Sequence, residues 1–317
     1  MFSRAPLTRI ESVDKASTWL QSYDSVIQIR GEHLFVCCSR LQTHARGVDA
    51  RSGSSRPIQS GVTVNQHPAE RPRKKTWIVL PAFNEEQDLP ALLERIDEAM
   101  AEIGLRFEIL LVDDGSTDAT REIAEQWSNK LPLQVKVHPT NLGLGATLRD
   151  GLQWACSIAE STDVIITLDA DNSHTPELIL RMTRMIREGH DVVIASRYQR
   201  GSRIRGVPLG RRLMSRLASF LFRVLFPIKG VRDYTCGYRA YRADVMQVVT
   251  RDDPDFFDQD GFQAMVDVLL KLRRNKDLVF GEVPLILRYD LKEGASKMNV
   301  RVTSQATLAL MVKRWIH

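Results

Sequence analysis

The stretch Val164-Ile165-Ile166-Thr167-Leu168-Asp169-Ala170-Asp171 decides the fold that we expect for this chain. An apolar, largely β-branched run that ends abruptly in charge is typical of a buried strand. In a parallel sheet, such a strand delivers its carboxyl end to the crevice where ligands bind. The carboxylates of Asp169 and Asp171 could share one Mg²⁺ or Mn²⁺ ion there. A strand that ends in solvated acids would show the same pattern, so the rest of the chain has to discriminate.

Short apolar runs alternate with helical patterns along the middle of the chain. This alternation predicts an α/β fold, with a mostly parallel central sheet and helices on both faces. The carboxyl ends of its strands would then meet at one edge of the sheet. The five expected strands span residues 77–80, 107–112, 133–137, 164–168 and 191–195.

Acidic residues follow two of these expected strands. Asp113 and Asp114 end the second strand, as Asp169 and Asp171 end the fourth. All four side chains would face one crevice, where they repel unless a cation or hydrogen-bond donors neutralise them. One arrangement places a metal at the second pair, against a diphosphate, and lets one acid of the first pair accept hydrogen bonds from a base or ribose. In the alternative arrangement, both acid pairs cap the helices that follow them.

The segment Asn141-Leu142-Gly143-Leu144-Gly145 follows the third expected strand. Its glycines would let the backbone approach a ligand closely before the next helix begins. A dinucleotide-binding fingerprint would need a third glycine at the position of Leu148, and that glycine is absent. No glycine-rich loop of this sequence ends in Gly-Lys-Ser or Gly-Lys-Thr either. The pattern therefore argues against a dinucleotide-dependent oxidoreductase and against a phosphate-loop hydrolase.

The charge of the chain is unevenly distributed. The 317 residues carry a formal net charge of +5, with 43% hydrophobic and 26% charged residues, which is an ordinary globular composition. Residues 1–75 hold 12 Lys and Arg against 6 Asp and Glu, so the remainder is close to neutral. This basic segment lacks the interleaved aromatic residues that bind nucleic-acid strands. We therefore expect no nucleic-acid partner.

Four motifs stand in order along the chain, namely Pro81-Ala82-Phe83-Asn84-Glu85, Val112-Asp113-Asp114-Gly115-Ser116, the glycine segment 141–145, and Asp169-Ala170-Asp171. Together they resemble the family 2 glycosyltransferases of the GT-A fold. Residues 76–300 resemble, more narrowly, the dolichyl-phosphate mannosyltransferase-like branch. The resemblance implies an inverting transfer from a nucleotide-sugar, with GDP-mannose favoured, to a polyprenyl or dolichyl phosphate. It also implies Mg²⁺ or Mn²⁺ at the Asp-x-Asp pair.

Later motifs extend the resemblance, namely Ser196-Arg197-Tyr198, Asp233-Tyr234-Thr235-Cys236-Gly237-Tyr238-Arg239, Glu282-Val283-Pro284 and Gly294-Ala295-Ser296-Lys297-Met298. The alternative for Arg197 and Arg239 is a structural ion pair. The resemblance implies catalytic roles for Asp169, Asp171, Arg197 and Asp233, and metal ligation by Asp169, Asp171 and Ser173. The nucleotide-sugar would contact Pro81, Ala82, Asn84, Glu85, Asp113, Asp114, Gly143, Gly145, Arg211 and Lys297.

Three positions depart from the pattern of the family. Ser173 stands where a glutamine completes the metal site, Lys292 where arginine is frequent, and Asp267 where glutamate is usual. Lysine keeps the charge of arginine but loses its bidentate fork. A phosphate acceptor needs no protein base, whereas a hydroxyl acceptor would need one, and Asp233 or Asp267 would be the candidates. Two alternatives therefore stay open: a family 2 enzyme that acts on a glycan or small molecule, and a catalytically silent nucleotide-sugar-binding protein.

Residues 209–226 favour a lipid acceptor on independent grounds. At about 100° per residue, Arg212, Arg216 and Arg223 fall in a narrow arc and leucine and phenylalanine side chains fill the other side. This pattern is typical of a helix that lies in a membrane interface. A helix that packs against a protein core would show the same stripe. No apolar run approaches the roughly 18 residues of a spanning helix.

The domain organisation that we expect has three parts. Residues 1–75 form a mostly disordered or irregular leader, with short strands conceivable at 26–29 and 34–38, or a segment that is not translated. Residues 76–300 form the catalytic domain, and residues 301–317 a C-terminal amphipathic helix. No signal peptide is predicted, and the spacing of the four cysteines fits neither a metal site nor a redox motif. We expect a cytoplasmic protein, with peripheral attachment to the cytoplasmic face of the membrane as an open variant.

Overall fold

The computed structural model describes residues 27–30, 33–36, 74–253, 255–294 and 300–316. The chain divides into two units, residues 1–66 and 67–317, which we describe separately. In the first unit, β1 (Ile27–Arg30) pairs antiparallel with β2 (His33–Val36), at the positions where the sequence allows two short strands. The linker expected at residues 46–73 lies outside the described residues.

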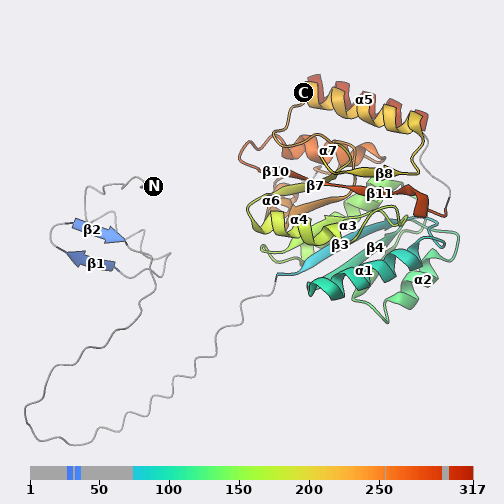
Figure 1. The fold of residues 1–317 in the computed structure, drawn as a ribbon, viewed down its shortest axis with the longest axis horizontal. Helices are drawn as coiled ribbons and strands as arrows, with labels where there is room; N and C mark the ends of the chain where they lie inside the picture. Colours follow the sequence, from blue (N-terminus) through green and yellow to red (C-terminus); the bar gives the residue numbers. More distant parts are fainter. Residues whose placement is uncertain (1–26, 31–32, 37–73, 254, 295–299, 317) are drawn as a thin grey trace, which may run out of the picture. The chain divides into compact units, whose positions relative to one another are not determined.

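The second unit is built on a seven-stranded sheet with the order β10-β7-β9-β6-β3-β4-β5 (Figure 1). All neighbours are parallel except β9, which runs antiparallel to both β6 and β7. The mostly parallel sheet and all five expected strands are therefore confirmed. The strands are β3 (Thr76–Ala82), β4 (Phe107–Asp113), β5 (Leu133–Val137), β6 (Val164–Thr167), β7 (Val192–Ser196), β9 (Arg239–Arg242) and β10 (Phe280–Pro284).

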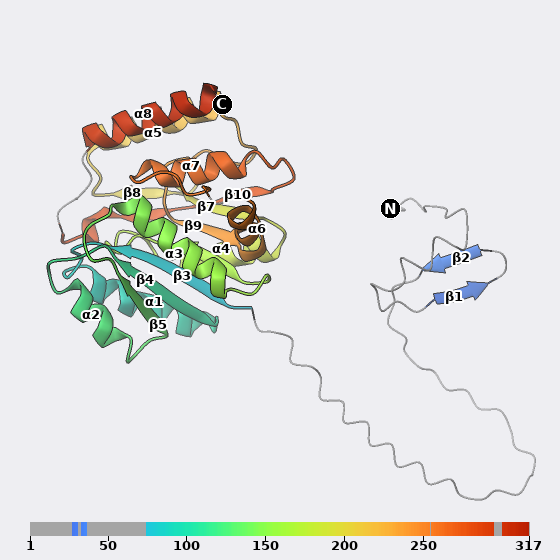
Figure 2. The same cartoon turned by 180° about the vertical axis from the view of Figure 1, so that it is seen from behind.

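Helices cover both faces of this sheet, as the alternating pattern predicts. In Figure 1, α1 and α4 lie in front of the strands, and in Figure 2 α3 and α6 lie in front of the opposite face. The apolar stripe of α1 is fully buried, so its 3.6-residue period decides which face of the helix meets the sheet. The helices are α1 (Leu89–Ile103), α2 (Thr120–Trp127), α3 (Leu144–Ile158), α4 (Leu178–Arg187), α6 (Ala243–Asp252) and α7 (Gln263–Leu272).

A short two-stranded sheet brings a late segment of the chain to the carboxyl end of β6. Strand β8 (Arg203–Arg205) pairs in parallel with β11 (Ile286–Arg288), which leads into the 3₁₀ helix η3 (Tyr289–Leu291). The backbone N–H of Arg288 donates to the carbonyl of Ser173 at 2.9 Å. The segment that follows η3 therefore lies beside the Asp-x-Asp turn.

Helices α5 (Leu209–Leu225) and α8 (Val300–Ile316) lie at the same end of the second unit (Figures 1 and 2). The apolar side of α5 is exposed, with Leu213, Leu217, Phe220 and Val224 between 52% and 69% accessible, and Phe222 is its buried anchor. The core-facing alternative for this helix is therefore wrong. Among the described residues, no helix is long and apolar enough to cross a membrane.

Candidate functional site

The turn after β6 holds Asp169 and Asp171 at the carboxyl end of the sheet. Asp171 accepts hydrogen bonds at Oδ1 from the backbone N–H of Ser173 at 3.2 Å and from the Ser173 hydroxyl at 2.6 Å. Asn172 adopts a left-handed conformation with φ of +53°, which closes the turn tightly. Helix α4 begins only at Leu178, after Glu177, so neither aspartate caps it. The capping alternative is wrong for this pair.

Arg95 of α1 fixes the same turn from the neighbouring helix. Its guanidinium donates to Asn172 Oδ1 at 2.8 Å and, more weakly, to the carbonyl oxygens of Asn172 and His174 at 3.4 and 3.5 Å. A fork of donors suits such a cluster of oxygens. The role of Arg95 was not expected, because the residue stands inside an ordinary helical pattern and belongs to no motif.

The two aspartates differ in their electrostatic surroundings. Desolvation raises the pKa of Asp169, and the like charge of Asp171 raises it further. Desolvation would also raise the pKa of Asp171. The charge of Lys292 outweighs this effect, together with the interaction with His174 and the hydrogen bonds from Lys292 and Ser173, and the pKa of Asp171 is lowered. The Lys292 ammonium lies 2.8 Å from Asp171 Oδ2. Asp171 is therefore the carboxylate that stays ionised most readily.

These residues fit a divalent cation that takes its other ligands from phosphate and water. Among the described residues, no group of three or more His, Cys, Asp or Glu side chains is arranged to hold a metal. Mg²⁺, however, is commonly bound through one or two carboxylates plus substrate phosphates. The Lys292 ammonium already lies 2.8 Å from Asp171 Oδ2. His174 Nδ1 is buried without a hydrogen-bond partner among the residues that the structure describes, 3.8 Å from Asp169 Oδ2, so it could orient that carboxylate.

The first two motifs interlock across β3 and β4. Asn84, with φ of +53°, accepts the N–H of Thr117 at its Oδ1 at 2.8 Å, and its own N–H donates to the Ser116 hydroxyl at 2.9 Å. That hydroxyl donates to Asp113.

The N–H of Glu85 donates to Thr120 Oγ1 at 2.7 Å. Pro81 and Ala82 end the buried strand β3, where Ala82 pairs with Asp113 in register. These expected contact residues therefore form one shelf beside the turn after β6.

Asp114 is occupied by the protein itself. It accepts hydrogen bonds from the backbone N–H of Leu142 at 2.9 Å and of Gly143 at 2.8 Å, and it lies 2.7 Å from His138 Nδ1. Helix α2 begins at Thr120 after Ala119, so neither this acid nor Asp113 caps it. The contacts leave Asp113 as the better candidate for a hydrogen bond to the donor. His138 follows β5 as the acids follow β4 and β6, and this position was the signal that could have revealed it.

The glycine segment approaches protein backbone where the sequence suggested a ligand. The N–H of Gly145 donates to the carbonyl of Asp260 at 2.9 Å, and a Cβ at Gly145 would lie 2.2 Å from the carbonyl oxygen of Gln259. Gly143 has φ of +91°, a conformation that side chains rarely adopt. A close crossing of two loops therefore accounts for the glycine at position 145, and a contact between Gly145 and a nucleotide-sugar stays a prediction.

Arg197 and Asp233 form a buried bidentate ion pair. Arg197 Nε and Nη2 lie 2.8 and 2.7 Å from the two carboxylate oxygens, and the Arg197 N–H donates to Oδ2 at 2.9 Å. Burial alone would raise the pKa of Asp233, but the charge and hydrogen bonds of Arg197 lower it. The Asp233 side chain is fully buried, whereas that of Arg197 is 19% exposed. Asp233 is therefore a weak base, and it holds Arg197 in place.

Arg239 and Asp267, the other two charged candidates, also have partners within the protein. Arg239 is fully buried and donates to the carbonyl oxygens of Tyr234, Cys236 and Met265, which is a structural role with carbonyl partners. Asp267 pairs with Arg314 of α8 through contacts of 2.6 and 2.8 Å, so it anchors that helix. Neither residue is arranged to act on a substrate.

Arg211 and Lys297 complete the expected contacts. Arg211 of α5 donates to the hydroxyl of Tyr289 at 2.9 Å, and its guanidinium lies 5.6 Å from the centre of that ring. It therefore joins α5 to the segment that carries Lys292. Lys297 lies outside the described residues.

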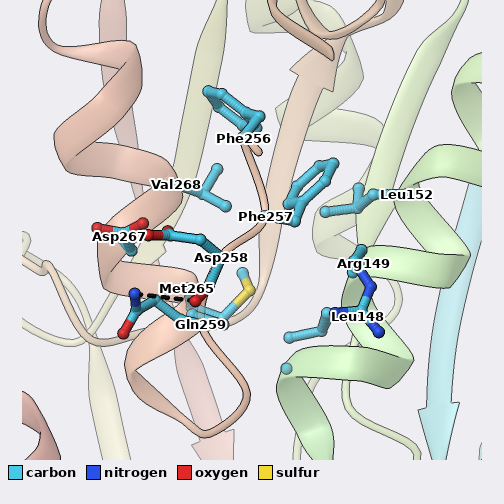
Figure 3. A pocket seen from close by; sticks show the side chains of 12 residues that line it. Leu148, Arg149, Leu152, Phe256, Phe257, Asp258, Gln259, Met265, Asp267 and Val268 are labelled. Atoms are coloured by element: carbon cyan, nitrogen blue, oxygen red, sulfur yellow. Dashed lines mark hydrogen bonds between the residues drawn. The ribbon is translucent and has the colours of Figure 1, made fainter. Parts of the chain in front are cut away.

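A small cavity between α3 and α7 is separate from this site (Figure 3). Its volume is about 10 Å³, which is room for about one water molecule. Leu148, Leu152 and Phe257 line it, and of the expected nucleotide-sugar contacts only Gly145 borders it. A nucleotide-sugar could not enter this cavity, so the candidate site stays the shelf at the ends of β3, β4 and β6.

Comparisons with known proteins agree with this geometry. Residues 77–250 match the family model described as glycosyl transferase family 2. The polyprenol monophosphomannose synthase of Mycolicibacterium smegmatis is 33% identical over 231 residues, which cover 72% of this chain and 83% of the relative. The dolichol-phosphate mannosyltransferase of Pyrococcus furiosus is 33% identical over 203 residues, and these cover 64% of this chain but only 54% of the relative.

The solved structure of glucosyl-3-phosphoglycerate synthase from Mycobacterium tuberculosis is similar in fold. That structure contains Mn²⁺, uridine diphosphate and glucosyl-3-phosphoglycerate. It superimposes with a TM-score of 0.56 at 21% identity, over 76% of this chain and 80% of the other. At this identity the likeness supports the expected GT-A fold and nothing finer.

Proposed function

The chain belongs to glycosyltransferase family 2, and on this premise we propose that it transfers a sugar from a nucleotide-sugar to a polyprenyl phosphate. The proposed donor is GDP-mannose, because both named relatives are mannosyl-transferring enzymes of polyprenol phosphates. The observation that carries the proposal is the Asp169–Asp171 pair, held at a strand end by Arg95 and Ser173. A divalent cation bound there would neutralise the charge that builds on the leaving diphosphate.

The state of Asp233 favours a phosphate acceptor over a hydroxyl. A hydroxyl acceptor must lose a proton, and a general base needs a pKa near the working pH. The Arg197 ion pair lowers the pKa of Asp233. Burial raises the pKa of Asp267, but both carboxylate oxygens of Asp267 accept hydrogen bonds from Arg314. A phosphate oxygen is already ionised at neutral pH and needs neither residue. Its attack on the anomeric carbon would form the new C–O bond as the nucleoside diphosphate leaves from the opposite face with the bonding electrons.

Arg197 is the cation that the protein supplies permanently. Asp233 and the hydroxyl of Thr235, which lies 2.6 Å from Nη2, fix its guanidinium. Within the described part of the chain, the Arg197 side chain donates through Nε and Nη2, and its Nη1 group could bind phosphate in fixed geometry. We therefore assign Arg197 to the phosphate groups and Asp233 to the orientation of Arg197. Ser173 donates to Asp171, so we assign it the orientation of that carboxylate, and metal ligation by Ser173 stays a prediction.

The exposed apolar side of α5 would place the site at a membrane surface. Leu213, Leu217 and Phe220 are exposed on this helix, which also carries Arg212, Arg216 and Arg223. Apolar side chains that insert between lipids, with arginines at the anionic headgroups, are what an interfacial helix requires. Arg211 links the same helix to Tyr289, and so to the segment beside the Asp-x-Asp turn.

Nucleotide release under defined conditions tests the proposal. Purified protein would be incubated with Mn²⁺ and GDP- or UDP-sugars, with polyprenyl phosphate in vesicles, with a soluble glycan acceptor, or with none. We expect release of GDP from GDP-mannose only with polyprenyl phosphate, together with a mannosylated lipid product. Release only with soluble acceptors, or binding without release, would contradict the proposal.

A pair of variants separates the membrane surface from the chemistry. Leu217→Glu should reduce transfer to vesicle-bound acceptor by about tenfold, because it places a charge in the face that inserts into lipid. Val248→Glu is the matched control, since Val248 is 44% exposed on α6. Both variants should act equally on a short, water-soluble polyprenyl phosphate. Equal losses with vesicles would remove α5 from the proposed interface.

A further inference from the structure

Lys292 contacts Asp171, the carboxylate that we expect to bind a metal ion. Its Nζ lies 2.8 Å from Asp171 Oδ2, and only 7% of its side chain is exposed. Burial opposes its charge, but attraction to Asp171 and then to Glu85 raises the pKa of the ammonium. The side chain is therefore a charged lysine enclosed among carboxylates.

Both oxygens of Asp171 are consequently engaged. Ser173 donates to Oδ1 with its N–H and its hydroxyl, and Lys292 donates to Oδ2. A Mg²⁺ ion would have to approach one of these oxygens to about 2.0–2.1 Å. An ammonium and a divalent cation on the same carboxylate repel each other strongly at this separation. A divalent cation on Asp171 would therefore weaken the contact between Asp171 and the Lys292 ammonium.

The backbone around Lys292 is pinned on both sides, so its position is built into the fold. The Arg288 N–H donates to the carbonyl of Ser173 at 2.9 Å. Beyond Lys292, the N–H groups of Glu293 and Gly294 donate to the Asp88 carboxylate at 2.8 and 3.1 Å. Rotation of the flexible four-carbon side chain is then the simplest way for the ammonium to leave Asp171.

We propose that Lys292 is the resident counter-ion of Asp171 and that a divalent cation binds by displacing its ammonium. The inference rests on the proposed function, because it assumes that Asp171 ligates the metal. The displaced ammonium needs a new anionic partner, and the diphosphate of the nucleotide supplies one. Metal and diphosphate therefore bind cooperatively: the metal alone leaves the ammonium without its partner, whereas the two together do not.

Mn²⁺ binding, measured by electron paramagnetic resonance, tests this exchange without any turnover. Lys292→Met keeps the shape of the side chain and removes the charge, and Lys276→Met at an exposed position is the matched control. We expect Lys292→Met to bind Mn²⁺ alone about tenfold more tightly than the unmodified chain, and Lys276→Met to be unchanged. We also expect GDP to strengthen Mn²⁺ binding much less in Lys292→Met. Equal or weaker binding of Mn²⁺ alone by Lys292→Met would overturn the exchange.

Two further measurements separate failure of the exchange from failure of the metal assignment. Asp171→Asn should abolish the high-affinity Mn²⁺ site both in the otherwise unmodified chain and in Lys292→Met. If Asp171→Asn keeps that site, the metal assignment itself is wrong. In the unmodified chain, modification of Lys292 by an amine-reactive reagent, read by mass spectrometry, should rise several-fold when Mg²⁺ is added. Unchanged modification of Lys292 in a chain that binds Mg²⁺ through Asp171 would overturn the exchange alone.

Discussion

One acid pair follows β4 and another follows β6 in the same sheet, and the surroundings of the two pairs differ. Asp114, after β4, is held by two backbone N–H groups and by His138. Asp171, after β6, is held on one oxygen by a lysine side chain that can move. A carboxylate satisfied by fixed donors builds the fold, whereas one satisfied by a displaceable cation is available to a ligand. We therefore expect substitution of Asp171 to reduce activity and substitution of Asp114 to reduce stability.

The largest effect should come from Asp171→Asn. The change removes the charge that binds a cation but keeps the shape of the side chain, so we expect transfer to fall at least about 10³-fold. The urea-induced unfolding transition should still show a folded protein, although the Lys292 ammonium loses its charged partner. The exposed Asp277→Asn is the control. Activity within about tenfold of the unmodified chain would remove Asp171 from the metal site.

Asp114→Asn should reverse this pattern. An amide NH₂ in place of one carboxylate oxygen opposes the N–H of either Leu142 or Gly143, and a buried donor left without an acceptor is costly. We expect the free energy of unfolding to fall by about 3 kcal/mol, measured by urea denaturation. If the variant stays as stable as the Asp277→Asn control but loses donor binding, Asp114 is a ligand residue and the contrast with Asp171 fails.

Gly145→Ala should weaken the loop crossing next to Asp114. The new Cβ would lie 2.2 Å from the carbonyl oxygen of Gln259, so the loop of residues 259–260 has to shift. We expect a loss of about 2 kcal/mol in unfolding free energy, typical of overpacking. Gly210→Ala is a matched control, because nothing lies within 4 Å of a Cβ at that helical position. Equal stability of the two variants would return Gly145 to the expected ligand contacts.

The smallest effect concerns pH. Asp233 resembles Asp114 in having fixed partners, and Arg197 lowers its pKa although burial opposes this. The stability contributed by the pair is complete above the ordinary carboxyl pKa of about 3.9 and is lost as the pH falls through the lower pKa of the folded protein. Asp233→Asn should therefore be less stable at pH 7 and lose less stability below pH 4. Parallel curves of unfolding free energy against pH would contradict the ion-pair role.

The sequence predicts most of the sheet because β3, β4, β6 and β7 are largely buried and read as continuous apolar runs. Strand β9 could not be predicted in this way. It has only four residues, Arg239–Arg242, begins and ends with arginine, and runs antiparallel between β6 and β7. A buried arginine that donates to carbonyl oxygens looks, in sequence, like a surface residue.

The positions of candidate site residues can be predicted where residue type and place along a strand decide them. Asp169, Asp171 and Arg197 could be selected in this way, and the structure gathers them at the carboxyl side of the sheet. The purposes of Asp114 and Gly145 could not be predicted, because they depend on loops far away in the chain. Arg95 and Lys292 act through tertiary contacts with the turn after β6, and local sequence carries no signal for such contacts.

Strand β9 also affects how the chain folds while it is being synthesised. The middle of the sheet stays incomplete until residues 239–242 have left the ribosome, because β6 and β7 are joined only through β9. Until then both strands present unpaired edges of backbone N–H and C=O groups, which are the usual starting points for aggregation. A nascent chain that ends before residue 239 should therefore depend on chaperones more than the full chain does.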